Sequence, residues 1–444
     1  MEPLNIHINK EYDRRRFLSM VGKGMGLATL CSASLTAFMN NLNAATKRIE
    51  NLSPEEAAMD EDYWFEIQQA FSVTRGITNL NNGGVSPSPR IVTEALVRYI
   101  WESEDATAYT MWAILEPQSE TIRAGLADVF GVDREEIAIT RNASESLEIL
   151  LMGMDLKSGD EILTTTQDYP RMLTTLRQRE LREGLSLKLI KVPIAPKNID
   201  DIAEQFEKGI TPKTRVMLIS HVINITGQIT PVKAVCDLGR SKGIEVIVDG
   251  AHSFGHFDFK QKDLGCDYYG TSLHKWLYAP KGTGLLYVKK DKIPKIWSLM
   301  ATEKTEAADI RKYEEIGTHP AAPRLAIGEA ILFHNGIGPK RKENRLRYLS
   351  RYWMNRLKDL PGVKFHTSFD PNQSCGIGNV EIEGIDPGAI GTYLMDKHKI
   401  FVTPIIHDEF KGLRITPNVY TTLKELDRFC DVMETIARKG LPKG

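Results

Sequence analysis

The stretch SLHKW, Ser272 to Trp276, places a lysine between an apolar run and a glycine-rich one. Apolar and aromatic neighbours can lower the pKa of a lysine by desolvation, and a neutral amine can form a Schiff base with a carbonyl compound. A single lysine at a strand end is more often a surface side chain whose stem lies along apolar residues. Lys275 is therefore a candidate for covalent chemistry, and the case for it depends on the residues around it.

Two further stretches could bind charged groups. In TRNASES, Asn142, Ala143 and Ser144 stand between a predicted strand and a predicted helix. Free N–H groups and the helix dipole favour a phosphate or carboxylate there, although Asn142 and Ser144 are also preferred cap residues. In EVIVDGAH, Asp249 closes an apolar strand. A buried carboxylate needs a cationic partner such as a protonated ring nitrogen, although Asp before Gly is also common in turns.

Asn224 in SHVINITG and Tyr169 after ILTTTQD follow two more predicted strands. Alone, the asparagine could bond its own backbone and the tyrosine could pack in the core. Together, the five stretches supply a phosphate site, an aromatic face, an amide, a carboxylate and a lysine at successive strand ends. These are the groups that hold pyridoxal phosphate, with the helix start for its phosphate, Asp249 for its ring nitrogen and Lys275 for its aldehyde.

The elements that position these residues alternate between helix and strand from about residue 118 onward. Several of the strands are nearly continuous apolar runs, as expected of strands that are covered on both faces. The pattern predicts an α/β fold with a mostly parallel sheet, in which ligands bind at the carboxyl ends of the strands. Upstream, Ser53, Pro54 and Glu56 form a capping-box start for a single helix that runs toward residue 71.

We expect four segments along the chain. They are a signal peptide over residues 1–45, an N-terminal segment over 46–89, a large cofactor-binding domain over 90–315 and a smaller α+β domain over 316–444. The last boundary rests on Gly317, Pro320 and Pro323, which interrupt the chain before a helix-rich part.

The N-terminus resembles a twin-arginine export signal. Arg14, Arg15 and Arg16 precede Phe17, and a weakly apolar, Gly/Ala/Ser-rich run follows to about Met39. The alternative is a basic tail or an amphipathic helix; Lys23 and several glycines argue against a spanning helix. The signal predicts an exported, periplasmic protein that engages the twin-arginine export machinery, with cleavage near residues 42–45.

The composition limits which classes of binding partner are expected. The chain has 444 residues, of which 42% are hydrophobic and 26% charged, and its formal net charge is -1. After the N-terminus it has no long single-sign block, so neither a nucleic-acid groove nor a polybasic membrane patch is predicted. Cys236, Cys266, Cys375 and Cys430 are widely spaced, without a disulfide or zinc framework, and no metal site is predicted. Cys236 and Cys430 fall on apolar helix faces, which favours buried packing thiols.

The segments VDGAHSFGHFDF and GCDYYGTSLHKWLYAPKGTGLLYV resemble the cofactor core of the class V aminotransferases. This is the fold-type I pyridoxal-phosphate family that includes isopenicillin N epimerases, cysteine desulfurases and kynureninases. The resemblance extends from about residue 79 to about residue 429, and GTHPAAPRLAIGEAI and LRITPNVYTT make it greatest to isopenicillin N epimerase-like proteins.

The resemblance implies roles for individual residues. Lys275 would carry the cofactor aldehyde, Asp249 would pair with the ring nitrogen, and Tyr169 would stack over the ring. Asn224 and His252 would lie near the phenolic oxygen. Further positions would contact the phosphate, namely Ala143, Ser144, Ser272 and His274. Gly317 and Thr318 would reach the phosphate of a neighbouring subunit, which implies a homodimer. Arg414 would hold the substrate carboxylate, and Asn82 would line the substrate pocket.

The resemblance implies an amino-acid-type substrate and removal of its α-proton by Lys275. Transamination, epimerisation and β-elimination share this step, so the residues predict an aminotransferase or epimerase class and not one reaction. A desulfurase would need a nucleophilic cysteine shortly before Arg414; KIFVTPIIHDEFKGLRI contains none, and Cys375 lies too far upstream. Two alternatives stay open: a β-lyase or desulfurase-like enzyme, and an exported binding scaffold without turnover.

Overall fold

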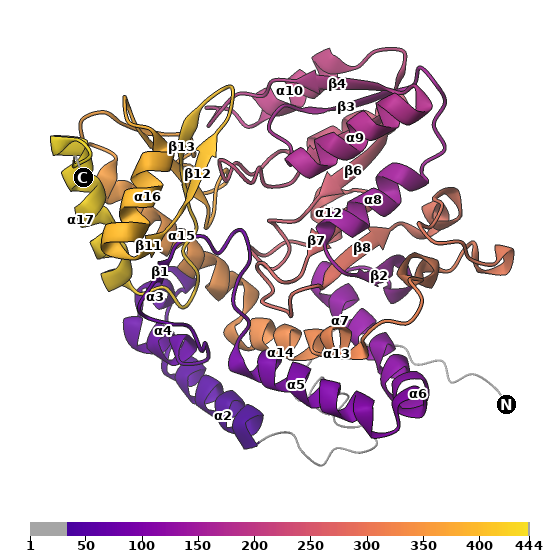
Figure 1. The fold of residues 1–444 in the computed structure, drawn as a ribbon, viewed down its shortest axis with the longest axis horizontal. Helices are drawn as coiled ribbons and strands as arrows, with labels where there is room; N and C mark the ends of the chain where they lie inside the picture. The colour runs from indigo at the N-terminus through magenta and orange to yellow at the C-terminus, as the bar shows by residue number, and fades with distance from the viewer. Residues whose placement is uncertain (1–32, 443–444) are drawn as a thin grey trace.

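The computed structural model describes residues 33–442, and a seven-stranded sheet forms the centre of its large domain (Figure 1). In spatial order its strands are β2 (Ile137–Thr140), β8 (Gly284–Val288), β7 (Tyr268–Ser272), β6 (Glu245–Asp249), β5 (Thr214–Ser220), β3 (Glu161–Thr165) and β4 (Ser186–Ile190). Strand β8 runs opposite to the other six strands of this sheet. The prediction of a mostly parallel α/β sheet is confirmed.

Both faces of this sheet are covered, which explains the apolar strands. In β5, Val216 and Leu218 belong to one hydrophobic cluster, while Met217 and Ile219 belong to another on the opposite face. Helix α7 (Ser119–Phe130) precedes the first strand of the sheet. The other helices connect successive strands: α8 (Ala143–Gly153), α9 (Pro170–Glu183), α10 (Asp200–Gly209), α11 (Val232–Lys242) and α12 (Gln261–Leu264). All the parallel strands therefore present their carboxyl ends at one edge.

The smaller domain has its own antiparallel sheet and core. Its strand order is β12 (Thr403–Ile406), β13 (Lys411–Ile415), β10 (Gly378–Ile382) and β9 (Val363–Phe365). Three helices accompany it: α15 (Pro339–Leu357), α16 (Pro387–His398) and α17 (Leu423–Lys439). Trp353 of α15 and Phe429 of α17 are fully buried in this core.

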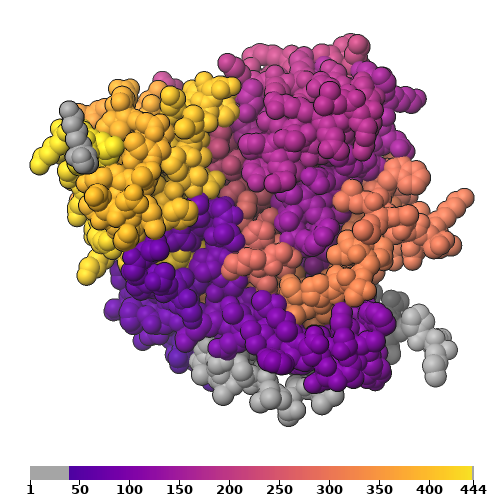
Figure 2. Space-filling view, viewed as in Figure 1, coloured from indigo at the N-terminus to yellow at the C-terminus, as the bar shows by residue number. Residues whose placement is uncertain are grey.

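The part of the chain from residue 33 to residue 109 lies against the small domain and continues along the large one (Figures 1 and 2). Its elements are α2 (Ala33–Arg48), α3 (Pro54–Met59), α4 (Glu61–Gln68), β1 (Thr78–Asn79), α5 (Arg90–Asp105) and α6 (Thr107–Tyr109). Strand β1 pairs in parallel with β11 (Ile400–Phe401) of the small domain. This pairing holds the segment that follows β1 close to β13, where Asn81 bridges to Thr416.

The expected single helix from Ser53 is two helices. The capping box forms as predicted, since Ser53 Oγ accepts from Glu56 N–H and the Glu56 carboxylate accepts from Ser53 N–H. Asp60 then adopts an extended conformation, and its side chain caps α4 by accepting from Tyr63 N–H at 2.9 Å. The carboxylate thus ends one helix and starts the next.

The boundary expected at residue 316 precedes two helices that pack with the large domain. These are α13 (Ala321–Leu325) and α14 (Ile327–Ile337), and both contact α5. Ile327, Ile331 and Phe333 belong to the cluster that also holds the large-sheet residues Met217 and Ile219. The small-domain core therefore begins at α15.

Short helical turns complete the described chain. They are the π-helix η1 (Thr110–Leu115) and the 3₁₀ helices η2 (Glu116–Gln118), η3 (Arg134–Glu136), η4 (Lys290–Lys295), η5 (Lys304–Glu306) and η6 (Ile310–Glu314). Within residues 33–442, no helix has the length and apolar character needed to cross a membrane.

The twin-arginine motif lies outside the described residues, whereas the expected cleavage region lies inside α2. Leu42, Ala45 and Ile49 are at most 3% exposed and belong to the large hydrophobic cluster. Helix α2 contacts α4 and α14. Residues from Leu42 onward are therefore part of the folded core.

Candidate active site

A cavity of about 190 Å³ opens at the carboxyl ends of the parallel strands. It is lined by side chains that follow β2, β3, β5, β6 and β7, as the sequence predicts for a ligand site in such a sheet. The predicted residues that line it are Ala143, Ser144, Tyr169, Asn224, Asp249, His252, Ser272, His274 and Lys275. Residues separated by more than a hundred positions therefore meet in one cavity.

One end of the cavity is suited to an anion. Ala143 and Ser144 start α8, where Asn142 is the N-cap and accepts from Glu145 N–H at 2.9 Å. Ser272, at the end of β7, accepts from Ala143 N–H at 2.9 Å. Capping does not exclude an anion here, because Asn142 satisfies one N–H group while the helix dipole still favours a negative charge in front of the helix.

Asp249 occupies the floor of the cavity at the end of β6. It is 6% exposed, and its Oδ1 accepts from Ala251 N–H at 2.9 Å. Burial raises the pKa of this carboxyl to about 6, while the Ala251 N–H and the positive charge of Lys275 act in the opposite direction. A cation that approached Asp249 would stabilise the carboxylate, which suits a protonated ring nitrogen.

Lys275 points inward, contrary to the alternative of a surface lysine. Its Nζ lies 3.1 Å from Nε2 of His252. Burial lowers the pKa of Lys275 to about 8; Asp249 opposes this shift and Arg414 adds to it. The N-terminal segment holds the backbone of the same loop, since Ser86 N–H donates to His274 O at 3.2 Å. The amine is thus partly neutral near pH 8 and fixed in the cavity.

Arg414 of β13 lies 7% exposed beside this cavity. Its Nη1 donates to Asn224 O at 3.2 Å and its Nη2 donates to Asn81 Oδ1 at 2.8 Å, while its buried Nε has no hydrogen-bond partner in the described part of the chain. Among residues 33–442, no carboxylate forms an ion pair with this guanidinium. Burial lowers its pKa to about 10. Such a group is a preformed site for an anion.

Tyr169 is not a core residue, which removes the alternative of ordinary packing. It lies 42% exposed at the start of α9, one residue before Pro170, and lines the cavity. Its exposed ring can cover a flat ligand in the cavity. The tyrosine therefore stands where the resemblance places a ring-stacking residue.

Asn82 lies elsewhere than the resemblance implied. It is fully buried, and its amide donates to Asn79 O at 3.0 Å and to Thr416 O at 2.9 Å. Its Oδ1 accepts from Tyr420 OH at 2.7 Å. The neighbouring Asn81, which the sequence analysis missed, contacts Arg414 instead. The NNGG turn signalled the segment, but did not show which asparagine faces the site.

Thr318 also lies apart from the Lys275 cavity within the single chain. It lines a separate cavity of about 250 Å³ with Met111, Trp112, His319 and Arg324. This placement leaves Thr318 without a role in the cavity of its own chain. A contact with a second subunit stays a prediction.

The cysteines pack in the interior. Cys236, Cys266, Cys375 and Cys430 are free and buried, and the prediction for Cys236 and Cys430 is confirmed. Burial raises the pKa of Cys375 to about 11. A buried, protonated thiol is a poor nucleophile.

The residues of the cavity fit pyridoxal phosphate. The start of α8 with Ser272 suits a phosphate, Asp249 suits a ring nitrogen, and Lys275 supplies an amine for an aldehyde. The buried Nε of Arg414, which no described residue pairs, leaves one more anion site beside them. The donor set thus matches the cofactor and a carboxylate together.

Comparison with known proteins points to the same cofactor. A family model described as aminotransferase class-V matches residues 78–421. Isopenicillin N epimerase of Streptomyces clavuligerus is 27% identical over 394 residues, which cover 84% of this chain and 98% of that protein. A probable cysteine desulfurase of Halalkalibacterium halodurans is 29% identical over 351 residues, covering 74% and 85% of the two chains.

Solved structures share the fold. The structure of a cysteine desulfurase from Thermococcus onnurineus is 22% identical, with a TM-score of 0.74, and the match covers 86% of this chain and 98% of that one. The family match spans most of the chain and includes every predicted site residue. The chain therefore belongs to the aminotransferase class-V family, whose members are pyridoxal-phosphate-dependent enzymes.

Proposed function

We propose that the protein removes the α-proton of an amino-acid-type substrate, as an epimerase or aminotransferase does. One observation carries this proposal: among residues 33–442 the buried Arg414 guanidinium has no carboxylate partner, and it bonds Asn224, which lines the Lys275 cavity. A buried cation without a counter-ion favours binding of an anion from solution. The substrate carboxylate supplies that anion, and the planar guanidinium can bind it with two hydrogen bonds.

Lys275 then acts as the base. Bound pyridoxal phosphate supplies an electron sink for the pair that is left when a proton leaves the α-carbon. Burial lowers the pKa of the Lys275 amine to about 8, and in its neutral form this amine can accept the proton. Asp249 and the start of α8 orient the site, and Tyr169 shields it from water.

A hydrogen-exchange experiment tests this proposal. The holoenzyme is incubated in deuterated water with a panel of amino acids, and deuterium at the α-carbon is measured by mass spectrometry. We expect incorporation with at least one amino acid, loss of incorporation in Lys275→Ala, and weaker substrate binding in Arg414→Gln. An amine without an α-carboxylate that exchanges as well as its parent amino acid would contradict the role of Arg414.

Product analysis separates the alternatives. Racemised substrate indicates an epimerase, an oxo acid formed only with an added acceptor indicates an aminotransferase, and sulfide or pyruvate from cysteine or cystine indicates a lyase. A structurally similar protein, 22% identical to this chain, is a cystine C-S lyase, which supports testing for β-elimination. A desulfurase is disfavoured, because the described segment from β11 to β13 contains no cysteine and Cys375 is 2% exposed.

We further propose a homodimer. An apolar surface supports it, which we call the aromatic face: Trp101 of α5, Tyr109 of α6 and Trp112 of η1, which are 71%, 67% and 59% exposed. Trp112 lines the same cavity as Thr318, the residue expected to reach a second subunit. Exposed aromatic side chains of this size are typical of protein interfaces.

We also propose that the protein is exported by the twin-arginine pathway with its cofactor already bound, since that pathway carries folded proteins. Because Leu42 and Ala45 are buried against the core, cleavage before residue 42 would preserve these contacts. Fractionation and N-terminal sequencing of the native protein test both points, and unprocessed protein confined to the cytosol would contradict export.

The alternative of an exported binding scaffold without turnover makes a different prediction. Such a protein would still bind its partner after Lys275→Ala.

A further inference from the structure

Both ring nitrogens of His252 have a partner in the structure. Its Nε2 lies 3.1 Å from Lys275 Nζ, and its Nδ1 lies 3.4 Å from the indole nitrogen of Trp276. An indole nitrogen carries a hydrogen and can only donate, so the Nδ1 atom must accept. In a neutral imidazole the hydrogen then resides on Nε2, and Nε2 faces the lysine.

His252 is neutral in this environment. It is 5% exposed, and burial lowers its pKa well below the ordinary value of histidine. The ionisable groups that act on it are Lys275, Arg414, His256 and His274, and all four disfavour a positive charge on the ring. A second hydrogen on the ring would also face the indole N–H directly, donor against donor.

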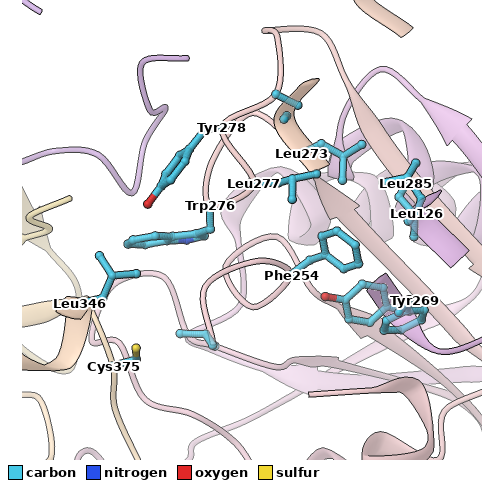
Figure 3. Packing of buried hydrophobic residues seen from close by; sticks show 14 of the residues in the cluster. Leu126, Phe254, Tyr269, Leu273, Trp276, Leu277, Tyr278, Leu285, Leu346 and Cys375 are labelled. Atoms are coloured by element: carbon cyan, nitrogen blue, oxygen red, sulfur yellow. The ribbon is translucent and has the colours of Figure 1, made fainter. Parts of the chain in front are cut away.

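The indole cannot turn away from His252. Its ring stacks on the His256 ring with centroids 3.7 Å apart and planes 2° apart. His256 is itself fixed, because its Nδ1 donates to His252 O at 2.7 Å and its Nε2 accepts from Gly376 N–H at 2.9 Å. Figure 3 shows Trp276 in the hydrophobic cluster that also includes Leu346 and Cys375 of the adjoining domain.

The backbone of Trp276 is held as well. Lys342 of α15 is fully buried, and its Nζ donates to Trp276 O. The same nitrogen lies 4.0 Å from the centre of the Tyr278 ring. His256 therefore holds the ring of Trp276 and Lys342 holds its backbone, and neither residue lines the Lys275 cavity.

We propose that Trp276 is a positioning residue, whose indole N–H holds His252 in the tautomer that presents a hydrogen-bond donor to the Lys275 amine. This rests on the proposed role of Lys275. The neutral amine has a lone pair that accepts from Nε2–H, whereas an ammonium has only donors. The tautomer therefore stabilises the neutral amine, which is the form that attacks a carbonyl and accepts a proton. Its effect adds to that of burial.

The first test measures Lys275 without substrate. The full-length chain is freed of cofactor and acetylated briefly with a limiting reagent at several pH values, and modification of Lys275 is quantified by mass spectrometry. In Trp276→Phe the ring still stacks on His256 but the N–H is gone, so His252 can turn its hydrogen to Nδ1 and accept from an ammonium. We expect the midpoint of Lys275 acetylation to rise by about one pH unit.

Trp353→Phe is the matched control. Trp353 is also fully buried, but its indole nitrogen has no hydrogen-bond partner among the described residues and it lies in the small-domain core. We expect this variant to keep the wild-type midpoint. An unchanged midpoint in Trp276→Phe, or an equal rise in both variants, would overturn the proposal.

The second test needs no substitution at Trp276. In wild-type protein labelled with ¹⁵N-histidine, the His252 signals are assigned by their loss in His252→Gln, and the tautomer is read from the ring-nitrogen shifts. Hydrogen on Nε2 is the expected result. Hydrogen on Nδ1, or on both nitrogens, would overturn the proposal even if Trp276→Phe failed to fold. Neither test depends on turnover, so an unexpected reaction would leave both interpretable.

Discussion

Asn81 Oδ1 accepts a hydrogen bond of 2.8 Å from Nη2 of Arg414, whereas the adjacent Asn82 turns away and bonds the backbone of Thr416. Two consecutive asparagines thus have different tasks. One orients the guanidinium that is proposed to bind the substrate carboxylate, and the other attaches the N-terminal segment to the small domain.

This difference predicts opposite phenotypes for two matched variants. Asn81→Ala should raise KM for the substrate by about tenfold with little change in Tm, because it removes one hydrogen bond to a charged group. Asn82→Ala should lower the free energy of unfolding by about 2 kcal/mol, because it leaves buried partners unpaired. Steady-state kinetics and thermal unfolding of both variants check this. A loss of stability in Asn81→Ala with an unchanged KM would contradict the assignment.

The titration of Asp249 predicts a pH dependence of stability. Its pKa is raised by burial from 3.8 to about 6, so the folded protein holds a proton that the unfolded chain releases between these values. Stability from this group is fully present below pH 3.8 and is lost as the pH rises through about 6. In the cofactor-free chain, the difference in unfolding free energy between wild type and Asp249→Asn should therefore change by about 3 kcal/mol across this window.

Urea unfolding of both proteins at intervals from pH 4 to pH 7 measures that difference. The wild type should lose stability relative to Asp249→Asn with rising pH. If the unfolding free energies of the two proteins change in parallel with pH across the whole range, Asp249 does not titrate in this window. The buried carboxylate would then not be a cause of the pH dependence of stability.

The aromatic face predicts a variant that separates the subunits. Trp112→Glu places a charge on this face and should convert a dimer to monomers, as measured by light scattering after size-exclusion chromatography. Leu181→Glu is the control, because Leu181 is 89% exposed on α9, outside the aromatic face. A monomeric wild type would contradict the homodimer, and a dimer that persists in Trp112→Glu would contradict its location.

The buried thiols predict insensitivity to cysteine substitution. Cys375→Ala should leave α-proton exchange within about twofold of wild type, since a methyl group replaces a protonated side chain outside the cavity. Exchange and sulfide release are measured with the same preparation. Sulfide release from cysteine that disappears in Cys375→Ala would instead indicate desulfurase chemistry.

Much of the site could be predicted because topology restricts where strand ends lie. Once alternating helices and apolar strands indicate a parallel sheet, Asp249, Asn224 and Tyr169 must meet at one edge, however far apart they are in sequence. Lys275 follows the same logic, since β7 runs parallel to β6. These strand-end residues could therefore be predicted without knowledge of side-chain packing.

Other features depend on tertiary contacts that no local pattern reveals. Helix α14 looked like part of the small domain, but its apolar residues pack with the large sheet. Asp60 splits a continuous amphipathic stretch, because its side chain caps the next helix. The contact between Trp276 and His252 joins two loops that only the folded sheet brings together.

The central claim is that Lys275 binds pyridoxal phosphate covalently. The visible absorption spectrum of the purified protein is recorded before and after borohydride reduction, followed by peptide mapping, with Lys342→Ala as a comparison for the other buried lysine of this region. We predict a yellow protein whose band disappears on reduction and whose labelled peptide contains Lys275. A colourless protein that stays so with added pyridoxal phosphate, or a label on another lysine, would contradict it.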